Sequence, residues 1–192
     1  MRTGVYKRKT NETNVAVSLD LEKHKPSKIN TGIGFFDHML ELFAFRAGIT
    51  LEVSCQGDLH IDGHHTVEDV GICLGRALEA ALGDKAGIAR YGTAWLPMDE
   101  SLAHVALDIS GRGFLVFNAA IPSPVVGGFD TELTEEFFRA LAHNAGITLH
   151  INLSYGSNTH HIIEAMFKAL GCAIGQAIKN TGTGISSTKG VL

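Results

Sequence analysis

The sequence predicts an α+β fold of two layers, in which a β-sheet/helix half-domain occurs twice and the helices pack on one face of each sheet. Short segments with alternating apolar and polar residues, typical of half-buried strands, are separated by longer segments with apolar residues at helical spacing. Residues 45–51 also match residues 143–149 at an offset of 98, and His64-His65 matches His160-His161 at an offset of 96. A repeat of this length indicates that one supersecondary unit has been duplicated.

The first half contains the elements of one such unit. Residues 7–20 are predicted to be extended, because Val15, Val17 and Leu19 alternate with polar or smaller residues. The remaining elements are a helix that ends near Arg46, a strand at residues 49–53 and a helix at about residues 66–82. The glycines at 32 and 34 do not form a dinucleotide-binding loop, since the third glycine and a preceding strand are absent.

The second half repeats the order helix, strand, turn and His-His-x-x-Glu helix after two strands of its own. Its predicted elements are strands at residues 102–108, 114–117 and 148–154, helices at 134–145 and 160–179, and a tail at 181–192. We therefore divide the chain into a first repeat, residues 1–92, and a second repeat, residues 93–192. Two like halves should be related by a pseudo-twofold axis.

Composition excludes several classes of protein. Of the 192 residues, 45% are hydrophobic and 19% are charged, which predicts an ordinary globular core. A net charge of -4 argues against a nucleic-acid partner. The three cysteines are scattered, so neither a disulfide framework nor a thiolate zinc site is indicated. Without a leader or an apolar run of roughly 18 residues, we expect a cytoplasmic protein with no membrane partner.

The His-His-x-x-Glu motif occurs once in each half. On a helix, His64 and Glu68 share a face, as do His160 and Glu164. Adjacent imidazoles point about 100° apart on a helix, so each motif suits two ions rather than one. One copy alone is better explained by an exposed helix start whose glutamate offsets the helix dipole. Two copies at matching places in a repeat indicate metal binding.

Two further candidate ligands are related by the repeat. His38 lies near a helix start, and its counterpart at an offset of 98 is Glu136. The complete set divides evenly between two ions and comprises His38, His64, His65, Glu68, Glu136, His160, His161 and Glu164. Imidazole and carboxylate ligands without thiolate suit Zn, Fe, Ni, Co or Mn, and the sequence does not choose among them. Four cations, Arg90, Arg112, Lys168 and Lys189, are candidates for phosphate binding, although each alone is better explained as a solvated side chain.

Several motifs, in this order along nearly the whole chain, resemble those of imidazoleglycerol-phosphate dehydratases, the hydro-lyases of histidine biosynthesis. The matching segments are residues 36–40, 62–69, 97–100, 108–112, 160–168 and 189–192. This resemblance implies a fold like domain 2 of ribosomal protein S5. It also implies a homo-oligomer of 24 subunits built from trimers, with metal sites shared between subunits.

The resemblance also implies a reaction. Water would be eliminated from D-erythro-imidazole glycerol phosphate to give imidazole acetol phosphate, with two Mn²⁺ ions per active site. The substrate ring would ionise to a metal-bound imidazolate, and a diazafulvene would form as hydroxide leaves. Glu12 and Glu164 would move protons. The phosphate would be bound by Arg90, Arg112, Lys168, Ser187 and Lys189.

This sequence departs from the family pattern at three places. Glu136 stands where many members have histidine before Phe-Phe-Arg, and Leu42 stands where many have glutamine. A carboxylate can still bind manganese, so the first change alters the charge of the site. The tail reads Ser-Ser-Thr-Lys at residues 186–189 where Pro-Ser-Ser-Lys is frequent, and this change affects the assignment of Ser187.

Three other functions are consistent with parts of the sequence. A different dinuclear metal hydrolase, such as a phosphatase or amidohydrolase, would use the same ligands to activate water. A non-catalytic assembly would use the metals only to join subunits. An RNA-binding protein would share the two-layer architecture, but the acidic balance of the chain argues against it.

Overall fold

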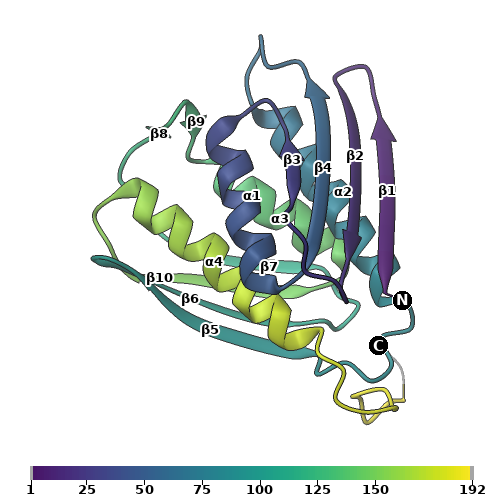
Figure 1. Cartoon of the computed structure of the whole chain (residues 1–192). Coiled ribbons are helices and arrows are strands. Elements are labelled where there is room, and N and C mark those ends of the chain that lie inside the picture. Colours follow the sequence, from purple (N-terminus) through teal and green to yellow (C-terminus); the bar gives the residue numbers. More distant parts are fainter. Residues whose placement is uncertain (1, 191–192) are drawn as a thin grey trace.

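The computed structural model describes residues 2–190, and its four helices lie between two four-stranded sheets (Figure 1). The first sheet consists of β1 (Thr3–Lys9), β2 (Thr13–Asp20), β3 (Lys28–Asn30) and β4 (Thr50–Gly57). The second consists of β5 (Tyr91–Met98), β6 (Ser101–Asp108), β7 (Phe114–Asn118) and β10 (Thr148–Tyr155). The helices are α1 (Gly34–Ala47), α2 (His64–Leu82), α3 (Leu133–Ala145) and α4 (Thr159–Ala177). A short hairpin, β8 (Val125–Val126) and β9 (Phe129–Asp130), precedes α3.

Both sheets have the same topology. Their strand orders are β1-β2-β4-β3 and β5-β6-β10-β7. In each sheet the last pair is parallel and the other pairs are antiparallel. A parallel pair needs a crossover connection, which α1 provides between β3 and β4 and α3 provides between β7 and β10. Val15, Val17 and Leu19 are buried and alternate with partly buried residues, so one face of β2 lies in the core, as its sequence predicts.

The helices of the two halves pack against each other between the sheets. Helix α2 covers β1 and β2, and α4 covers β5 and β6. Helix α1 packs on α4, whereas α3 packs on α2, so each helix pair joins the two halves. Phe137 and Phe167 stack at this junction with ring centroids 5.2 Å apart, and Phe36 meets Phe137 edge-on. Within residues 2–190, no helix combines the length and apolarity that crossing a bilayer requires.

Close contacts of four glycines and helix backbones show how far the duplication extends. A Cβ atom at Gly4 would overlap the carbonyl oxygen of Ala77, and one at Gly92 would overlap that of Ala173. Gly4 and Gly92 are 88 residues apart, and the two alanines are 96 apart. A second pair, Gly75 against Leu141 and Gly171 against Phe43, is related in the same way. The repeat therefore includes the strands β1 and β5, where no sequence match is evident.

The predicted α+β fold with a duplicated half-domain is confirmed, and the helices lie close to their predicted positions. The prediction that residues 7–20 form one extended segment is wrong. The Thr10 hydroxyl accepts hydrogen bonds from the N–H groups of Glu12 and Thr13, so the chain turns there and forms the hairpin β1–β2. The short strands β3, β8 and β9 were not predicted, and neither was β5. The division between residues 92 and 93 falls inside β5.

Candidate metal centre

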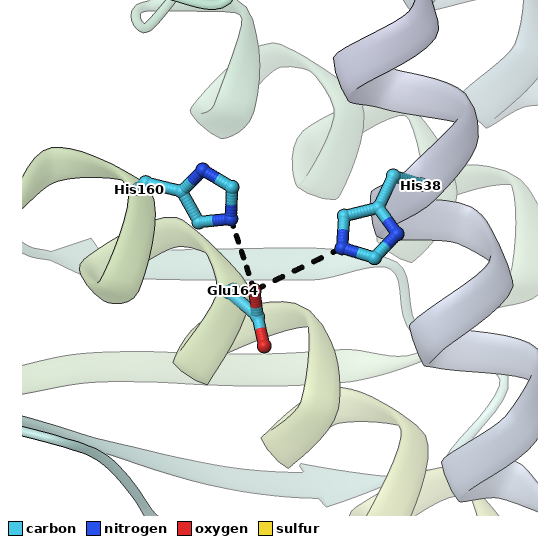
Figure 2. Close-up of side chains that lie close together, drawn as sticks. All are labelled: His38, His160 and Glu164. Carbon is cyan, nitrogen blue, oxygen red and sulfur yellow. Dashed lines mark hydrogen bonds and ion pairs between the residues drawn. The ribbon is translucent and has the colours of Figure 1, made fainter.

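Three of the eight candidate ligands converge at the junction of α1 and α4 (Figure 2). Nε2 of His160 lies 3.0 Å from Oε2 of Glu164, and Nε2 of His38 lies 3.9 Å from the same oxygen. One ligand atom from each of the three residues lies within 4.8 Å of the other two. Metal–ligand bonds of about 2.1 Å place the ligand atoms of one ion roughly 3.0 to 4.2 Å apart, and the distances from Glu164 to both imidazoles fall in this range. Among residues 2–190, this is the only such group of three.

Local bonds fix the two helix ends that carry this cluster. The Asp37 carboxylate accepts hydrogen bonds from the backbone N–H and the hydroxyl of Thr31, at 2.8 and 2.5 Å, which anchors the chain before α1. The side chain of Asn158 caps α4 by accepting a bond from the N–H of His161 at 3.2 Å. The ring of Phe35 meets the His160 ring edge-on at 5.2 Å. The cluster therefore lies at the starts of two anchored helices.

Glu164 is the buried member of the cluster and is 6% exposed. Its Oε1 is paired with the Lys168 ammonium one turn along α4, whereas its Oε2 faces the two imidazoles. Burial raises the pKa of the Glu164 carboxyl, but Lys168 and His160 outweigh burial and hold this pKa below its ordinary value. The carboxylate is therefore ionised at neutral pH, as a metal ligand must be.

A second set of candidate ligands, related to the first by the repeat, lies on α2 and α3. By the repeat offsets, Glu68 corresponds to Glu164, His64 to His160 and Glu136 to His38. Glu68 and Glu136 line one surface depression of about 220 Å³. Oε2 of Glu136 accepts a hydrogen bond from Arg139 at 2.5 Å, so this carboxylate is turned toward a cation on its own helix. The structure thus brings the two glutamates to one depression.

His65 and His161 point away from these clusters, and each is bonded to a carboxylate instead. Nδ1 of His65 lies 3.0 Å from Oδ2 of Asp58, and Nδ1 of His161 lies 2.7 Å from Oε2 of Glu100. These bonds raise the pKa of both imidazoles above the ordinary histidine value. Hydrogen bonds, the one to His161 first, hold the pKa of Glu100 far below its ordinary value. Nε2 of His65 lies 3.8 Å from Oε1 of Glu12, and Nε2 of His161 lies 3.7 Å from Oδ2 of Asp99, so neither Nε2 makes a hydrogen bond within residues 2–190.

Four of the five predicted phosphate-binding residues share one cavity of about 860 Å³. It is lined by Arg90, Arg112, Ser187 and Lys189, together with Tyr91, Ser110, Ser186 and Thr188. Nε and Nη2 of Arg90 bind the Asp108 carboxylate at 2.6 and 3.0 Å. This bond raises the pKa of the Arg90 guanidinium. The fifth residue, Lys168, lies beside Glu164 and Met98 and not in this cavity.

Glu12 lies in the turn between β1 and β2. Its Oε1 is 3.8 Å from Nε2 of His65, and its side chain is about half exposed, at 53%.

No role was predicted for Asp58 or Glu100 from the sequence, although Glu100 lies in a segment that resembles the family. The offset of 88 between Gly4 and Gly92 could have found Glu100, because the same offset relates it to Glu12. Val191 and Leu192, which end the last matching segment, lie outside the described residues.

The fold and the cluster together define a duplicated α+β protein with a candidate transition-metal centre at the junction of its halves. Comparison with known proteins makes the assignment more specific. A family profile described as imidazoleglycerol-phosphate dehydratase matches residues 31–174. A Bacillus thuringiensis relative with this name is 55% identical over the whole of both chains. One from Pelotomaculum thermopropionicum is 57% identical and covers 100% of this chain and 98% of that protein.

Two solved structures support the same assignment. Imidazoleglycerol-phosphate dehydratase from Staphylococcus aureus superimposes with a TM-score of 0.85 at 47% identity, covering 93% of this chain and 99% of that one. The enzyme from Pyrococcus furiosus, in complex with (S)-C348, gives a TM-score of 0.86 at 38% identity, covering 97% and 100%. The chain belongs to the imidazoleglycerol-phosphate dehydratase family. The predictions of the family and of a hydro-lyase are thereby confirmed.

Proposed function

We propose that this protein eliminates water from imidazole glycerol phosphate to give imidazole acetol phosphate, a step of histidine biosynthesis, and that it requires manganese. Family membership supports the reaction. The single structural observation that carries the manganese proposal is the convergence of His38, His160 and Glu164 at the junction of α1 and α4. Two imidazole nitrogens and one ionised carboxylate form a ligand set without thiolate, which Mn²⁺ accepts.

The proposed ligands fall into two related sets. His38, His160 and Glu164 would hold one ion, and His64, Glu68 and Glu136 on α2 and α3 would contribute to the other. Nε2 of His65 and of His161 would complete these sites from another subunit, because both rings point away from the clusters of their own chain. Two manganese ions bound there would supply Lewis acidity that favours ionisation of the substrate's imidazole ring.

The side chains would then transfer protons and bind the charged phosphate. The departing proton lies on a carbon without an adjacent carbonyl, so no side-chain base could remove it at the start. We infer that hydroxide leaves first, with a diazafulvene as the intermediate. Glu12, half exposed beside His65, and Glu164 would move the protons of this elimination. The cavity with Arg90, Arg112, Ser187 and Lys189 would bind the phosphate, with Lys168 contributed from elsewhere.

The distance between the two sites supports a subunit assembly. The N–H of Arg90 donates to the carbonyl of Ala177 at the end of α4, thirteen residues beyond Glu164. Thirteen helical residues span about 20 Å. The substrate has one imidazole ring, three chain carbons and one phosphate, which is too short for this span. A site that binds both its ends would therefore use two chains, in agreement with the proposed 24-subunit assembly of trimers.

The location of the protein is also a proposal. All three cysteines are free, and Cys55 and Cys73 are buried. Free thiols suit a reducing compartment, so we propose that the enzyme acts in the cytoplasm.

The test is an assay of the purified protein, stripped of metal and reloaded with Mn²⁺, on imidazole glycerol phosphate. We expect the keto product to appear without release of inorganic phosphate, and activity to disappear when the metal is removed. Phosphate release without a keto product would instead indicate a dinuclear hydrolase. Full activity in the metal-free protein would contradict the manganese proposal.

A further inference from the structure

We propose that Asp58 and Glu100 are positioning residues, which fix the ring orientation and the tautomer of His65 and His161 so that Nε2 of each ring is free to bind a cation. This inference rests on the proposed function, in which both histidines are metal ligands. Its basis is that both rings point Nδ1 at a carboxylate, at 3.0 and 2.7 Å. An ionised carboxylate only accepts hydrogen bonds, so Nδ1 carries the proton and Nε2 keeps its lone pair.

In the second half, Glu100 is itself held in place. Its Oε1 accepts hydrogen bonds from the backbone N–H groups of Ser157 and Asn158, at 3.1 and 2.7 Å, and from the Ser101 hydroxyl at 2.9 Å. Its Oε2 is therefore left to face His161. The same carboxylate thus joins the β5–β6 turn to the start of α4 and orients the imidazole there.

In the first half, Asp58 performs the same task from a different position. Both of its carboxylate oxygens approach Nδ1 of His65, at 3.2 and 3.0 Å. Among the described residues, the Asp58 carboxylate has no other hydrogen-bond partner. Exchanging the two oxygen positions of Asp58 would therefore break no hydrogen bond except those to His65, whereas the same exchange at Glu100 would break its bonds to Ser101, Ser157 and Asn158.

The repeat explains why two different positions supply the carboxylate. Glu12 and Glu100 are equivalent at an offset of 88, and both lie in the first turn of their sheet. The residues in close contact with Gly57 are the repeat counterparts of those in close contact with Gly156. The residues that follow these two glycines, Asp58 and Ser157, are therefore also equivalent. Serine has no carboxylate, and Glu100 takes that role in the second half. Because Asp58 serves His65, Glu12 is not used on Nδ1 and stays available beside Nε2.

This difference predicts unequal effects of two amide substitutions. In Glu100→Gln, the amide oxygen is needed by the N–H groups of Ser157 and Asn158, so its NH₂ group faces His161. The imidazole must then accept at Nδ1 and carry its proton on Nε2, which blocks metal binding. In Asp58→Asn, the amide can turn its oxygen to Nδ1 of His65, so the original tautomer survives.

The experiment is a titration of the metal-free protein with Mn²⁺, in which electron paramagnetic resonance reports the free ion. We expect Glu100→Gln to weaken one class of Mn²⁺ site about 10- to 100-fold, as loss of such partners generally does, and Asp58→Asn to weaken binding only a few-fold. The matched control is Asp62→Asn, because Asp62 bonds the backbone N–H of His64 and no imidazole. Thermal unfolding of each variant verifies that the fold is retained.

Two results would overturn the inference. One is Mn²⁺ affinity in Glu100→Gln equal to that of the parent protein. The other is an equal loss in Asp62→Asn, which would show that the effect follows net charge. A parent protein that binds no Mn²⁺ would contradict the proposed function instead. Neutron diffraction from the metal-free parent tests the inference separately: we expect deuterium on Nδ1 of both rings, and deuterium on Nε2 alone in either ring would refute it.

Discussion

Glu164 has a different partner on each of its carboxylate oxygens. Oε1 is paired with Lys168, and Oε2 faces His38 and His160. Glu12 is less buried than Glu164: its side chain is half exposed, and its carboxylate lies 3.8 Å from the ring of His65. The two glutamates proposed to move protons therefore differ in their contribution to the structure. Glu164 is buried and has three charged or imidazole partners, whereas Glu12 is half exposed and has one.

This difference leads to a prediction for Glu12→Gln. The substitution keeps the size of the side chain and removes its ability to exchange a proton, so we expect turnover to fall at least about 100-fold. Subunit assembly and the Mn²⁺ site at His38, His160 and Glu164 should be unchanged, since Glu12 belongs to neither helix of that cluster. Steady-state kinetics and light scattering measure the two properties. Unchanged turnover would remove Glu12 from the mechanism.

The buried thiols of Cys55 and Cys73 carry a second prediction. Burial raises the pKa of Cys55 to about 11 and that of Cys73 to about 12. Both thiols should therefore resist iodoacetamide at pH 8 in the native protein and react in guanidinium, as mass spectrometry of the peptides can show. Rapid modification of either thiol in the folded protein would contradict this burial.

The same pKa shifts predict a loss of stability at alkaline pH. Because the folded state raises both pKa values above the ordinary value of 9.0, the contribution of these thiols to stability is fully present below pH 9. It is lost as the pH rises through about 11 and 12. The free energy of unfolding should therefore decrease across this range.

At the scale of elements, the close approach of strand to helix depends on glycine. A Cβ atom at Gly92 would overlap the carbonyl oxygen of Ala173, so β5 would have to move away from α4. We expect Gly92→Ala to lower the free energy of unfolding by about 1 to 3 kcal/mol or more. Gly34→Ala is the control, because a Cβ atom there meets nothing within 4 Å. Equal melting temperatures for the two variants would contradict this packing.

The sequence predicted the long elements better than the short ones. The helices α2 and α4 have apolar faces over five turns, and their periodicity is clear. Strand β5 was not predicted, because its buried positions include Gly92 and its length includes Pro97, two residues that are rare in strands. Gly92 is there because α4 approaches closely, which is a tertiary contact that no local pattern shows.

For the whole molecule, the sequence predicted a set of candidate ligands but not how these residues group in space. The repeat identified His38 and Glu136 as counterparts, and the structure places His38 in the cluster with His160 and Glu164. The sequence could not show that His65 lies against Asp58 and His161 against Glu100, because these two carboxylates occupy different positions in the two halves. Lys168 also lies apart from the proposed phosphate cavity, because it lies nine residues before Ala177, the end of α4 that contacts Arg90 of that cavity.

We propose that the two halves bring imidazole and carboxylate side chains together around cations. Crystals of the manganese-saturated protein allow a direct test by anomalous diffraction at the manganese edge. We expect one peak within bonding distance of His38, His160 and Glu164, and a second at His64, Glu68 and Glu136. Well-ordered side chains without an anomalous peak between them would contradict it.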